Sequence, residues 1–477
     1  MNARLSDATL AVARPSIVRP AYDRASTTVG VVHFGPGAFH RAHQAFYFDE
    51  LLGRDPTCAV SAVSLRSPGV RNALAPQGGL YTLAELDEAT SFRVIGAIRE
   101  VLVAPETPEA VFARLADPRV RTVTITVTEK GYTLEGGGDL DARHPDIEHD
   151  LRTPQTPVSL VGWLLEGLRR RRATGAPPFD VVSCDNLVDN GARLRRAVVQ
   201  FAETSDRELA RWIEREVRFP RTMVDSITPA TDDALRRRVE VEVGLVDAWP
   251  IQREAFTQWV VEDALQPGAP DLRSVGVTLS NDVPAYDRAK LRLLNGAHST
   301  LAYLGLLRGH ETVAEAMADS ELARLVESMM REDIAPTISA PPELDLQSYL
   351  AAVLRRFRNP TIRHLLSQIA WDGSQKLPFR ILGTAADALA AGAPLSRLAL
   401  PLAAWMVFVR NRAREGADIV DPLAPRLLEL GRACTGDAGH DVQLFLQLET
   451  VFPRTLAGDA RLRSAVEVAY ARLPQIG

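Results

Sequence analysis

The sequence predicts an α/β domain at the N-terminus and a predominantly α-helical domain at the C-terminus. Over the first 283 residues, short runs of β-branched residues alternate with helical segments, which favours a mostly parallel sheet with crossover helices. The remainder of the chain shows only helical periodicity, interrupted by short breaks that contain Pro or Gly. At 477 residues the chain is also too long for one compact core, so two domains are expected.

The strands of the first domain are expected where apolar and β-branched residues gather between turn signals. The first strand is predicted at residues 28–35, followed by a helix at 38–52. Further strands are predicted at 58–65, 120–132, 179–186 and 275–282. The segments GLYTLAEL and SFRVIGAIREV indicate extra strands at an antiparallel edge.

The second domain begins where strand signals stop. Helical periodicity is clear in four segments, at residues 285–307, 313–332, 346–357 and 398–415. We therefore predict a dinucleotide-binding type of α/β domain at residues 1–283 and an all-helical domain at residues 284–477.

Composition argues against several classes of protein. A net charge of -5 and a pI near 6.1 give no electrostatic reason to expect nucleic acid as the main partner. The three cysteines are widely spaced and form no CxxC pair, which is typical of a reducing compartment. No apolar run reaches the ~18 residues of a membrane span, and the N-terminal segment resembles no signal peptide. We expect a cytoplasmic protein that does not act at a membrane.

Lysine is rare in this chain. Of the 55 basic residues only Lys130, Lys290 and Lys376 are lysine, and the rest are arginine. The lysine ammonium is compact and can lose its proton when it is desolvated, whereas the guanidinium group effectively cannot. The three lysines are therefore candidates for roles that arginine cannot fill, although chance survival of surface lysines is the alternative.

A glycine-containing turn follows the first predicted strand. In HFGPGAFHRAHQ, Gly35 and Gly37 stand where a dinucleotide-binding fold lets its backbone approach a pyrophosphate. The sixth position of the GxGxxG pattern is His40 rather than glycine, so a merely structural turn is the alternative. Only His40 and His43 of this segment share a helix face, and no Cys or carboxylate stands at ligand spacing, so no metal site is predicted.

The end of the second strand bears on the choice of cofactor. An acidic residue there favours NAD, while an arginine accommodates the 2′-phosphate of NADP. The segment SLRSPGVR carries Ser64 and Arg66 and no carboxylate. NAD is predicted as the cofactor, and NADP or dual use stays open.

The segment KLRLLNGAH, residues 290–298, places polar groups in an apolar helix. At roughly 100° per residue, and with Lys290 at zero, Asp287 falls at about 60°, His298 at about 80° and Asn295 at about 140°. One helix face is thus predicted to carry an acid, an amine, an amide and an imidazole. Burying these groups costs free energy unless they pair with one another or serve a function, and pairing is the alternative for each residue alone.

As a set, the four residues suit a zinc-independent dehydrogenase. A lysine desolvated by Leu and Ala can have its pKa lowered toward neutrality, which suits proton exchange with a hydroxyl group. The amide of Asn295 offers N–H donors to an alkoxide, and His298 can position a substrate hydroxyl. The hydride would come from a nicotinamide cofactor.

Six segments, GPGAFHRAHQ, TVTEKGY, SCDN, FPRTMVD, KLRLLNGAHS and DGSQKLP, occur in the order found in the polyol-specific long-chain dehydrogenases, the mannitol dehydrogenase family. The chain resembles this family from about residue 28 to 460. The resemblance implies a Rossmann-type N-terminal domain, a helical C-terminal domain, and a cleft between them for cofactor and substrate. It also implies a monomer or weak oligomer that binds a small sugar acid or polyol.

The resemblance also implies roles for individual residues. Lys290 is expected to be the catalytic acid/base, and Asn186 and Asn295 to stabilise the alkoxide. Asp287 stands where a glutamate links the lysine to solvent in the mannitol enzymes. Substrate binding is expected of His298 and Lys376. Residues expected to bind the cofactor are Gly35, Gly37, Phe39, His40, Arg41, Arg66 and Asp225.

The substrate is predicted from charge. EKGY carries Lys130 where mannitol enzymes tend to have glycine, and DGSQKLPFR resembles the fructuronate reductases of the family. A keto-uronate has a terminal carboxylate, so Lys130 or Lys376, with Arg380, is predicted to pair with it. D-Fructuronate and D-mannonate are therefore the predicted substrate pair. The alternatives are a mannitol or other polyol 2-dehydrogenase and a non-catalytic nucleotide-binding protein.

Overall fold

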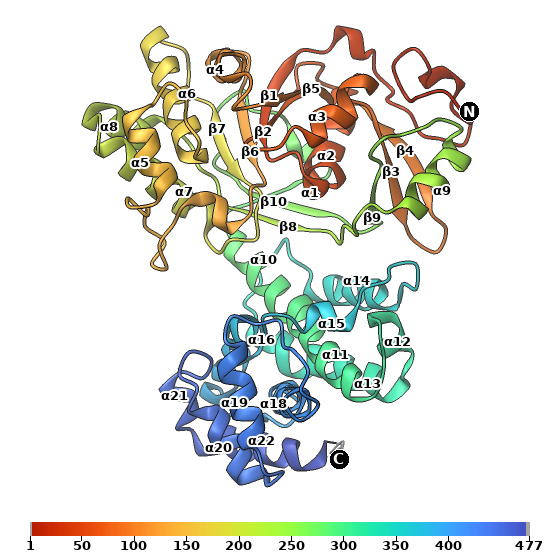
Figure 1. Ribbon diagram of the computed structural model, residues 1–477, viewed down its shortest axis with the longest axis vertical. Helices are drawn as coiled ribbons and strands as arrows, with labels where there is room; N and C mark the ends of the chain where they lie inside the picture. Colours follow the sequence, from red (N-terminus) through yellow and green to blue (C-terminus); the bar gives the residue numbers. More distant parts are fainter. Residues whose placement is uncertain (1, 474–477) are drawn as a thin grey trace. The chain divides into compact units, whose positions relative to one another are not determined.

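The computed structural model describes residues 2–473, and the chain divides into two compact units, Met1–Val283 and Pro284–Gly477. The first unit is built on a five-stranded sheet in the order β5-β2-β1-β6-β7, in which every neighbouring pair is parallel (Figure 1). Its strands are β1 (Val29–Phe34), β2 (Ala59–Ser64), β5 (Ile98–Val103), β6 (Thr122–Ile125) and β7 (Asp180–Ser183). The strand order reverses beside β1, which creates a crevice at the carboxyl ends of β1, β2 and β6.

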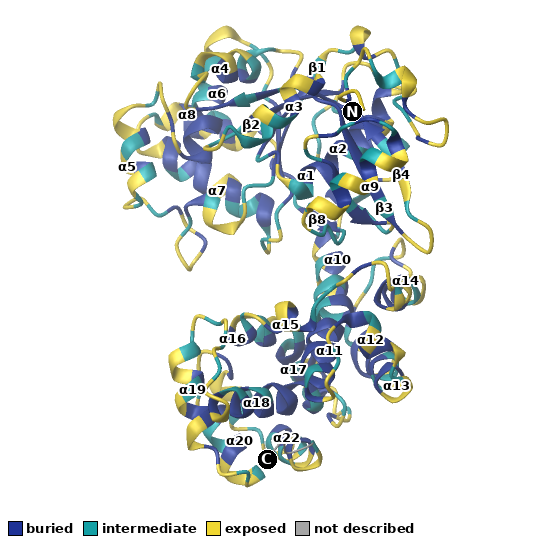
Figure 2. Cartoon of the chain, turned by 45° about the vertical axis from the view of Figure 1, so that its right-hand side comes forward, coloured by how far each residue is buried: buried dark blue, intermediate teal, exposed yellow. Residues whose placement is uncertain are grey.

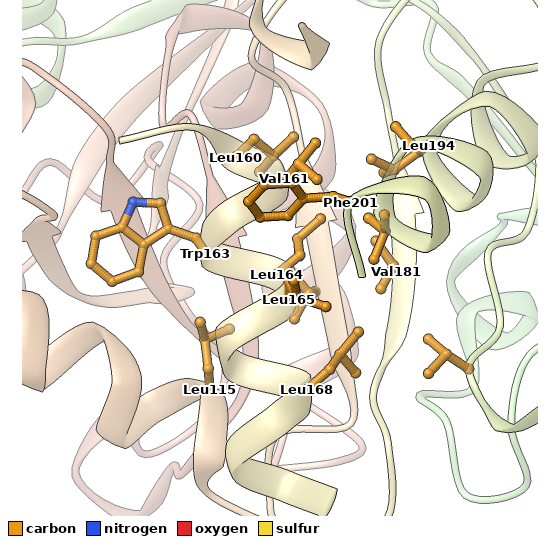
Figure 3. Packing of buried hydrophobic residues seen from close by; sticks show 14 of the residues in the cluster. Leu115, Leu160, Val161, Trp163, Leu164, Leu165, Leu168, Val181, Leu194 and Phe201 are labelled. Atoms are coloured by element: carbon orange, nitrogen blue, oxygen red, sulfur yellow. The ribbon is translucent and has the colours of Figure 1, made fainter. Parts of the chain in front are cut away.

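Both faces of this sheet are covered, because successive side chains of a strand point to opposite faces. Val32 and Phe34 of β1 belong to one apolar core, and Val31 belongs to the other. The first core is filled by α4 (Pro108–Ala116), α6 (Leu160–Thr174) and α7 (Asn190–Glu203). Figure 3 shows the side chains of α6 packed toward Val181 of β7 and Phe201 of α7. The second core is filled largely by α2 (Gln44–Leu52).

Two small sheets complete the first unit. One has the order β11-β10-β8 and the other the order β4-β3-β9. Their strands are β3 (Tyr81–Leu86), β4 (Ser91–Ile95), β8 (Thr222–Asp225), β9 (Ile251–Glu254), β10 (Gln258–Glu262) and β11 (Thr278–Ser280). The remaining α-helices of this unit are α1 (Ala38–Ala42), α3 (Gly69–Leu74), α5 (Pro145–Arg152), α8 (Arg207–Glu216) and α9 (Asp233–Val243).

Three elements differ from those the sequence predicts. The helix expected at 38–52 is broken at His43, whose φ and ψ are -117° and -85°. SFRVIGAIREV forms two strands: β4 pairs antiparallel with β3 as expected, but β5 joins the central parallel sheet. The strand expected at 120–132 ends at Ile125, because the part-buried carboxylate of Asp185 rather than a neighbouring strand accepts the N–H groups of Val127 and Thr128.

The second unit is helical. Its helices are α10 (Val283–Ala289), α11 (Gly296–Leu307), α12 (Val313–Ala318), α13 (Ser320–Ser328), α14 (Leu346–Arg358), α15 (Leu366–Ile369), α16 (Gly373–Leu377), α17 (Gly383–Ala390), α18 (Ala399–Arg414), α19 (Ala424–Ala433), α20 (Ala438–Leu446), α21 (Arg454–Ala457) and α22 (Ala460–Arg472). Helices α11 and α18 are largely buried and form its centre (Figure 2). Across residues 2–473, none of the helices has the length and apolar character needed to cross a bilayer.

Among the described residues of the second unit, three stretches are π-helical, with hydrogen bonds from residue i+5 to residue i. They are Lys290–Asn295, Met329–Ile334 and Pro378–Leu382. In the first, the N–H of Gly296 donates to the carbonyl of Leu291. Single π-helical turns are rare and are found frequently at functional sites. The first joins α10 to α11, and the third joins α16 to α17.

Candidate active site

A cavity of about 440 Å³ lies at the carboxyl ends of β1, β2 and β6 in the first unit. It is bordered by Gly35–Gly37 after β1, by 64–67 after β2 and by 126–128 after β6. Its volume falls within the range of cofactor and small-ligand sites, and its place is the switch point where Rossmann-type sheets bind dinucleotides. The predicted cofactor residues Gly35, Gly37 and Arg66 all border it.

The turn after β1 approaches its neighbours closely. Gly35 has φ +89°, and a Cβ there would lie 2.1 Å from the carbonyl oxygen of Thr126. At Gly37, by contrast, the nearest heavy atom to a Cβ would be the Gly35 oxygen at 3.8 Å. Gly35 is therefore required by the backbone, whereas Gly37 leaves open space beside the cavity. The cavity wall is bare main chain here, which fits a cofactor pyrophosphate.

The histidines near this turn are structural. His33 bonds to Thr124 through Nδ1 at 2.8 Å and to the Gly35 oxygen through Nε2 at 3.1 Å, which joins β1, β6 and the turn. The ring of His40 stacks on that of His33 with centroids 3.3 Å apart. Burial lowers the pKa of His33 to about 3, so it stays neutral. Among residues 2–473, no three His, Cys, Asp or Glu side chains form a group that could hold a metal ion.

Four of the predicted cofactor residues lie elsewhere. Phe39, His40 and Arg41 are on α1, and Asp225 is buried at the end of β8; the described lining of the cavity includes none of the four. Phe39 stacks on His43, with ring centroids 5.0 Å apart. Arg41 is 1% exposed and donates to the Trp249 carbonyl at 2.9 Å, and burial lowers its pKa to about 10. Its charge fixes α1 within the unit and is not presented to the cavity.

The SCDN segment begins at Ser183, the last residue of β7, and hydrogen bonds hold it on both sides. The carboxylate of Asp185 accepts the N–H groups of Val127 and Thr128 at 2.9 and 3.1 Å and the Tyr132 hydroxyl at 2.7 Å. Asn190 donates to the Asp185 carbonyl at 3.2 Å. Asn186 lies in the loop between them. Asp185 thus ties the loop of Asn186 to the cavity wall at 126–128.

The three lysines are divided between the two units. Lys130 is exposed, belongs to the short 3₁₀-helix Glu129–Tyr132 and borders the cavity of the first unit. Lys290 and Lys376 are both part-buried in the second unit. The geometry therefore associates Lys130 with the glycine turn and Arg66.

Lys290 and Asn295 begin and end the first π-helical stretch. Because a π-helix turns more slowly than 100° per residue, the angles calculated for a regular α-helix do not hold from Lys290 to His298. Both residues are part-buried, while Leu293 and Leu294 between them are buried. A Cβ on Gly296 would lie 2.9 Å from the Arg380 carbonyl oxygen, so this glycine permits close packing against the third π-helical stretch.

His298 is buried on α11 beside a second histidine that the sequence does not single out. The rings of His298 and His364 lie 4.9 Å apart and nearly perpendicular. His298 Nε2 and His364 Nδ1 are buried and have no hydrogen-bond partner in the described chain. Burial is the first cause that lowers the pKa of both rings, and the charges of Arg356 and Arg380 add to it. Both imidazoles are therefore neutral near pH 7 and can each bind a ligand group.

Two contacts fix the position of the DGSQK segment, which carries Lys376. A Cβ on Gly373 would lie 2.4 Å from the Tyr303 hydroxyl oxygen, so α16 packs directly on α11. Asp421 accepts the N–H of Ser374 at 2.8 Å and its hydroxyl at 2.5 Å. Lys376 Nζ donates to the Ile369 carbonyl at 3.3 Å. Burial and then the charge of Arg380 lower the pKa of Lys376.

Arg380 lies in the third π-helical stretch and donates to the Ser299 hydroxyl at 3.2 Å. Burial lowers its pKa to about 10. The charges that act on His364 come from Arg356, Arg380 and Lys376, and all three disfavour its protonation. Lys376, Arg380 and the two histidines form what we call the basic cluster of the second unit. Sequence reasoning missed His364, because a lone histidine in a loop carries no pattern.

The neutral state of His364 gives a testable dependence of stability on pH. Its pKa is about 4 in the fold, against about 6.5 in an unfolded chain, so between these values the unfolded state binds more protons. Its contribution to stability is present above pH 6.5 and is lost as the pH falls toward 4. We expect the free energy of unfolding of His364→Gln to fall less than that of the wild type between pH 7 and 5, by about 2 kcal/mol. Urea denaturation at each pH measures this; His440→Gln, on the surface of α20, is the control, and parallel curves for all three proteins would contradict the assignment.

Comparison with known proteins covers nearly the whole chain. Residues 29–274 match the mannitol dehydrogenase Rossmann domain, and residues 282–474 match the mannitol dehydrogenase C-terminal domain. A D-mannonate oxidoreductase of Escherichia coli is 39% identical, with 97% of this chain and 96% of that protein covered. A polyol:NADP oxidoreductase of Gluconobacter oxydans is 38% identical, with 84% of each chain covered.

A solved structure supports the same relationship. The ternary complex of Pseudomonas fluorescens mannitol 2-dehydrogenase with NAD and D-mannitol is 37% identical and has a TM-score of 0.82, with 98% of this chain and 96% of that chain covered. The predicted fold class, a Rossmann-type domain followed by a helical domain, is confirmed. The chain belongs to the mannitol dehydrogenase family and is an NAD(P)-dependent polyol or aldonate oxidoreductase of that family.

Proposed function

We propose that this enzyme reduces a keto sugar acid, D-fructuronate, to D-mannonate with NADH. The observation that carries this proposal is the basic cluster of the second unit. Lys376 and Arg380 are cations, and His298 and His364 add two buried ring nitrogens with no partner in the described chain. A carboxylate at the far end of the substrate would offset this positive charge, whereas a neutral polyol would not.

Sequence identity alone does not decide between the substrates. A D-mannonate oxidoreductase and a mannitol 2-dehydrogenase match the chain at 39% and 37% identity. Mannitol and fructose are therefore the second candidate pair, and that solved complex with D-mannitol favours them. The charge of the second unit is the observation that supports the sugar acid.

The residues of KLRLLNGAH and SCDN are proposed to carry out the reaction. Bound NADH supplies a hydride to the carbonyl carbon. As the C=O π bond breaks, the ammonium of Lys290 gives its proton to the carbonyl oxygen and becomes an amine. The amides of Asn186 and Asn295 donate to that oxygen while it carries negative charge. Asp287 returns a proton to Lys290 from solvent, and His298 holds a substrate hydroxyl.

The cofactor is proposed to lie along the cavity of the first unit. The pyrophosphate binds against the bare main chain at Gly35 and Gly37, and Lys130 is a candidate to pair with its negative charge. Asp225 is proposed to lie near the nicotinamide. In this proposal Lys376 and Arg380, rather than Lys130, bind the substrate carboxylate.

A substrate comparison tests the proposal. We expect kcat/KM with NADH to be at least about a hundredfold higher for D-fructuronate than for D-fructose. Lys376→Met should lower kcat/KM for D-fructuronate by about tenfold to a hundredfold, because a charged hydrogen bond is lost. The same variant should change kcat/KM for D-fructose far less. Gln375→Ala, its exposed neighbour, is the control. A wild-type preference for D-fructose would overturn the assignment to a sugar acid.

A further inference from the structure

The cavity of the first unit contains a carboxylate that its second strand does not provide. β2 ends at Ser64, and the residues after it are Leu65, Arg66 and Ser67. Such a strand usually ends near the adenosine ribose, where an acidic residue selects NAD. Here Asp146, from the first turn of α5, borders the same cavity. It is the one acidic side chain among the described residues of the lining.

Asp146 and Arg66 are in contact. Arg66 Nη2 lies 3.3 Å from Asp146 Oδ2, which links the loop after β2 to α5 across 80 positions of the sequence. The Arg66 side chain is 83% exposed and that of Asp146 is 28% exposed. An ion pair this exposed contributes little to stability, so Arg66 can exchange its partner at small cost. The loop beneath it is fixed, because the Ser64 hydroxyl donates to the Ser67 carbonyl at 2.6 Å.

We propose that Asp146 is the residue that determines cofactor specificity in this enzyme. With NAD bound, Asp146 stays paired with Arg66, and its carboxylate also accepts a hydrogen bond from the 2′-hydroxyl. With NADP, the 2′-phosphate must take Arg66 from Asp146 and lie close to the carboxylate, whose charge repels it. Arg66 makes NADP acceptable and Asp146 makes NAD preferred. This inference rests on the proposal that the cofactor binds in the cavity of the first unit. It does not depend on which sugar is the substrate.

Binding of cofactor fragments to the full-length chain tests this proposal without turnover. The probes are 5′-AMP, which carries the 2′-hydroxyl, and 2′,5′-ADP, which carries the 2′-phosphate; isothermal titration calorimetry gives both Kd values. For Asp146→Asn we expect the Kd of 2′,5′-ADP to fall by about tenfold and that of 5′-AMP to rise by a few-fold. Arg66→Gln should raise the Kd of 2′,5′-ADP by about tenfold and hardly change that of 5′-AMP.

The matched control is Glu148→Gln. Glu148 is exposed on the first turn of the same helix, it lies outside the described lining of the cavity, and its substitution changes the net charge equally. In the double variant with Arg66→Gln, Asp146→Asn should improve 2′,5′-ADP binding by less than it does alone. Equal effects of Asp146→Asn and Glu148→Gln would show only a general charge effect and overturn the proposal. An unchanged ratio of the two Kd values in Asp146→Asn would overturn it as well.

Discussion

Lys290→Ala is expected to lower kcat by about a hundredfold to ten-thousandfold while cofactor affinity stays within about twofold of the wild type. This range is what a positioned general acid or base contributes to a reaction. Lys290 is not among the described residues that border the cavity of the first unit, so its substitution leaves those residues unaltered. Steady-state turnover and the quenching of protein fluorescence by NADH measure the two quantities.

Two further variants separate proton transfer from a general loss of charge. Arg288→Ala removes a cation from the exposed side of α10, two residues away, and should leave kcat near the wild-type value. Lys290→Arg keeps the charge, but its guanidinium group cannot give up a proton at working pH, so its kcat should stay close to that of Lys290→Ala. A Lys290→Ala enzyme that turns over at the wild-type rate would refute the role proposed for this residue.

The two glycines after β1 should respond in opposite ways to a single methyl group. Gly35→Ala places a Cβ at φ +89° and 2.1 Å from the Thr126 carbonyl oxygen, so the turn must rebuild. We expect a loss of at least about 3 kcal/mol in the free energy of unfolding, or failure to accumulate soluble protein. Thermal unfolding monitored by circular dichroism measures this loss.

Gly37→Ala is the matched comparison. Its φ is -70°, and its Cβ would meet nothing closer than 3.8 Å, so the Tm should not change. The methyl group would instead enter the space beside the cavity, and the Kd for NADH should rise by about tenfold. A Gly35→Ala variant as stable as Gly37→Ala would show that the turn tolerates a side chain at Gly35. An unchanged Kd for NADH in Gly37→Ala would show that the cofactor does not bind beside this turn.

The sequence alone predicted the alternation of strands in the central sheet, because β1, β2 and β7 are short apolar runs bounded by turns. It could not show that SFRVIGAIREV contributes one strand to each of two sheets. The neighbour that a strand pairs with depends on tertiary packing, and hydrophobic periodicity does not predict it. It could not show the end of β6 either, because that end depends on Asp185, some sixty residues further along the chain.

The candidate site was predictable to a similar degree. Motifs located Gly35, Gly37 and Arg66, which all border the cavity of the first unit. They could not show that Arg41 is buried against Trp249, since a residue one position along a short helix can point into the unit or out of it. His364 and Asp146 belong to no motif, and only the fold brings them to their partners.

Lysine is scarce in this chain and the three lysines differ in exposure, so a chemical reagent can modify them selectively. Reagents that react with primary amines can modify three side chains and no others. Lys130 is exposed beside the cavity of the first unit, whereas Lys290 and Lys376 are part-buried in the other unit. An amine-reactive probe would therefore meet Lys130 first and the two part-buried amines only later. Covalent labelling can therefore distinguish the three lysines from one another.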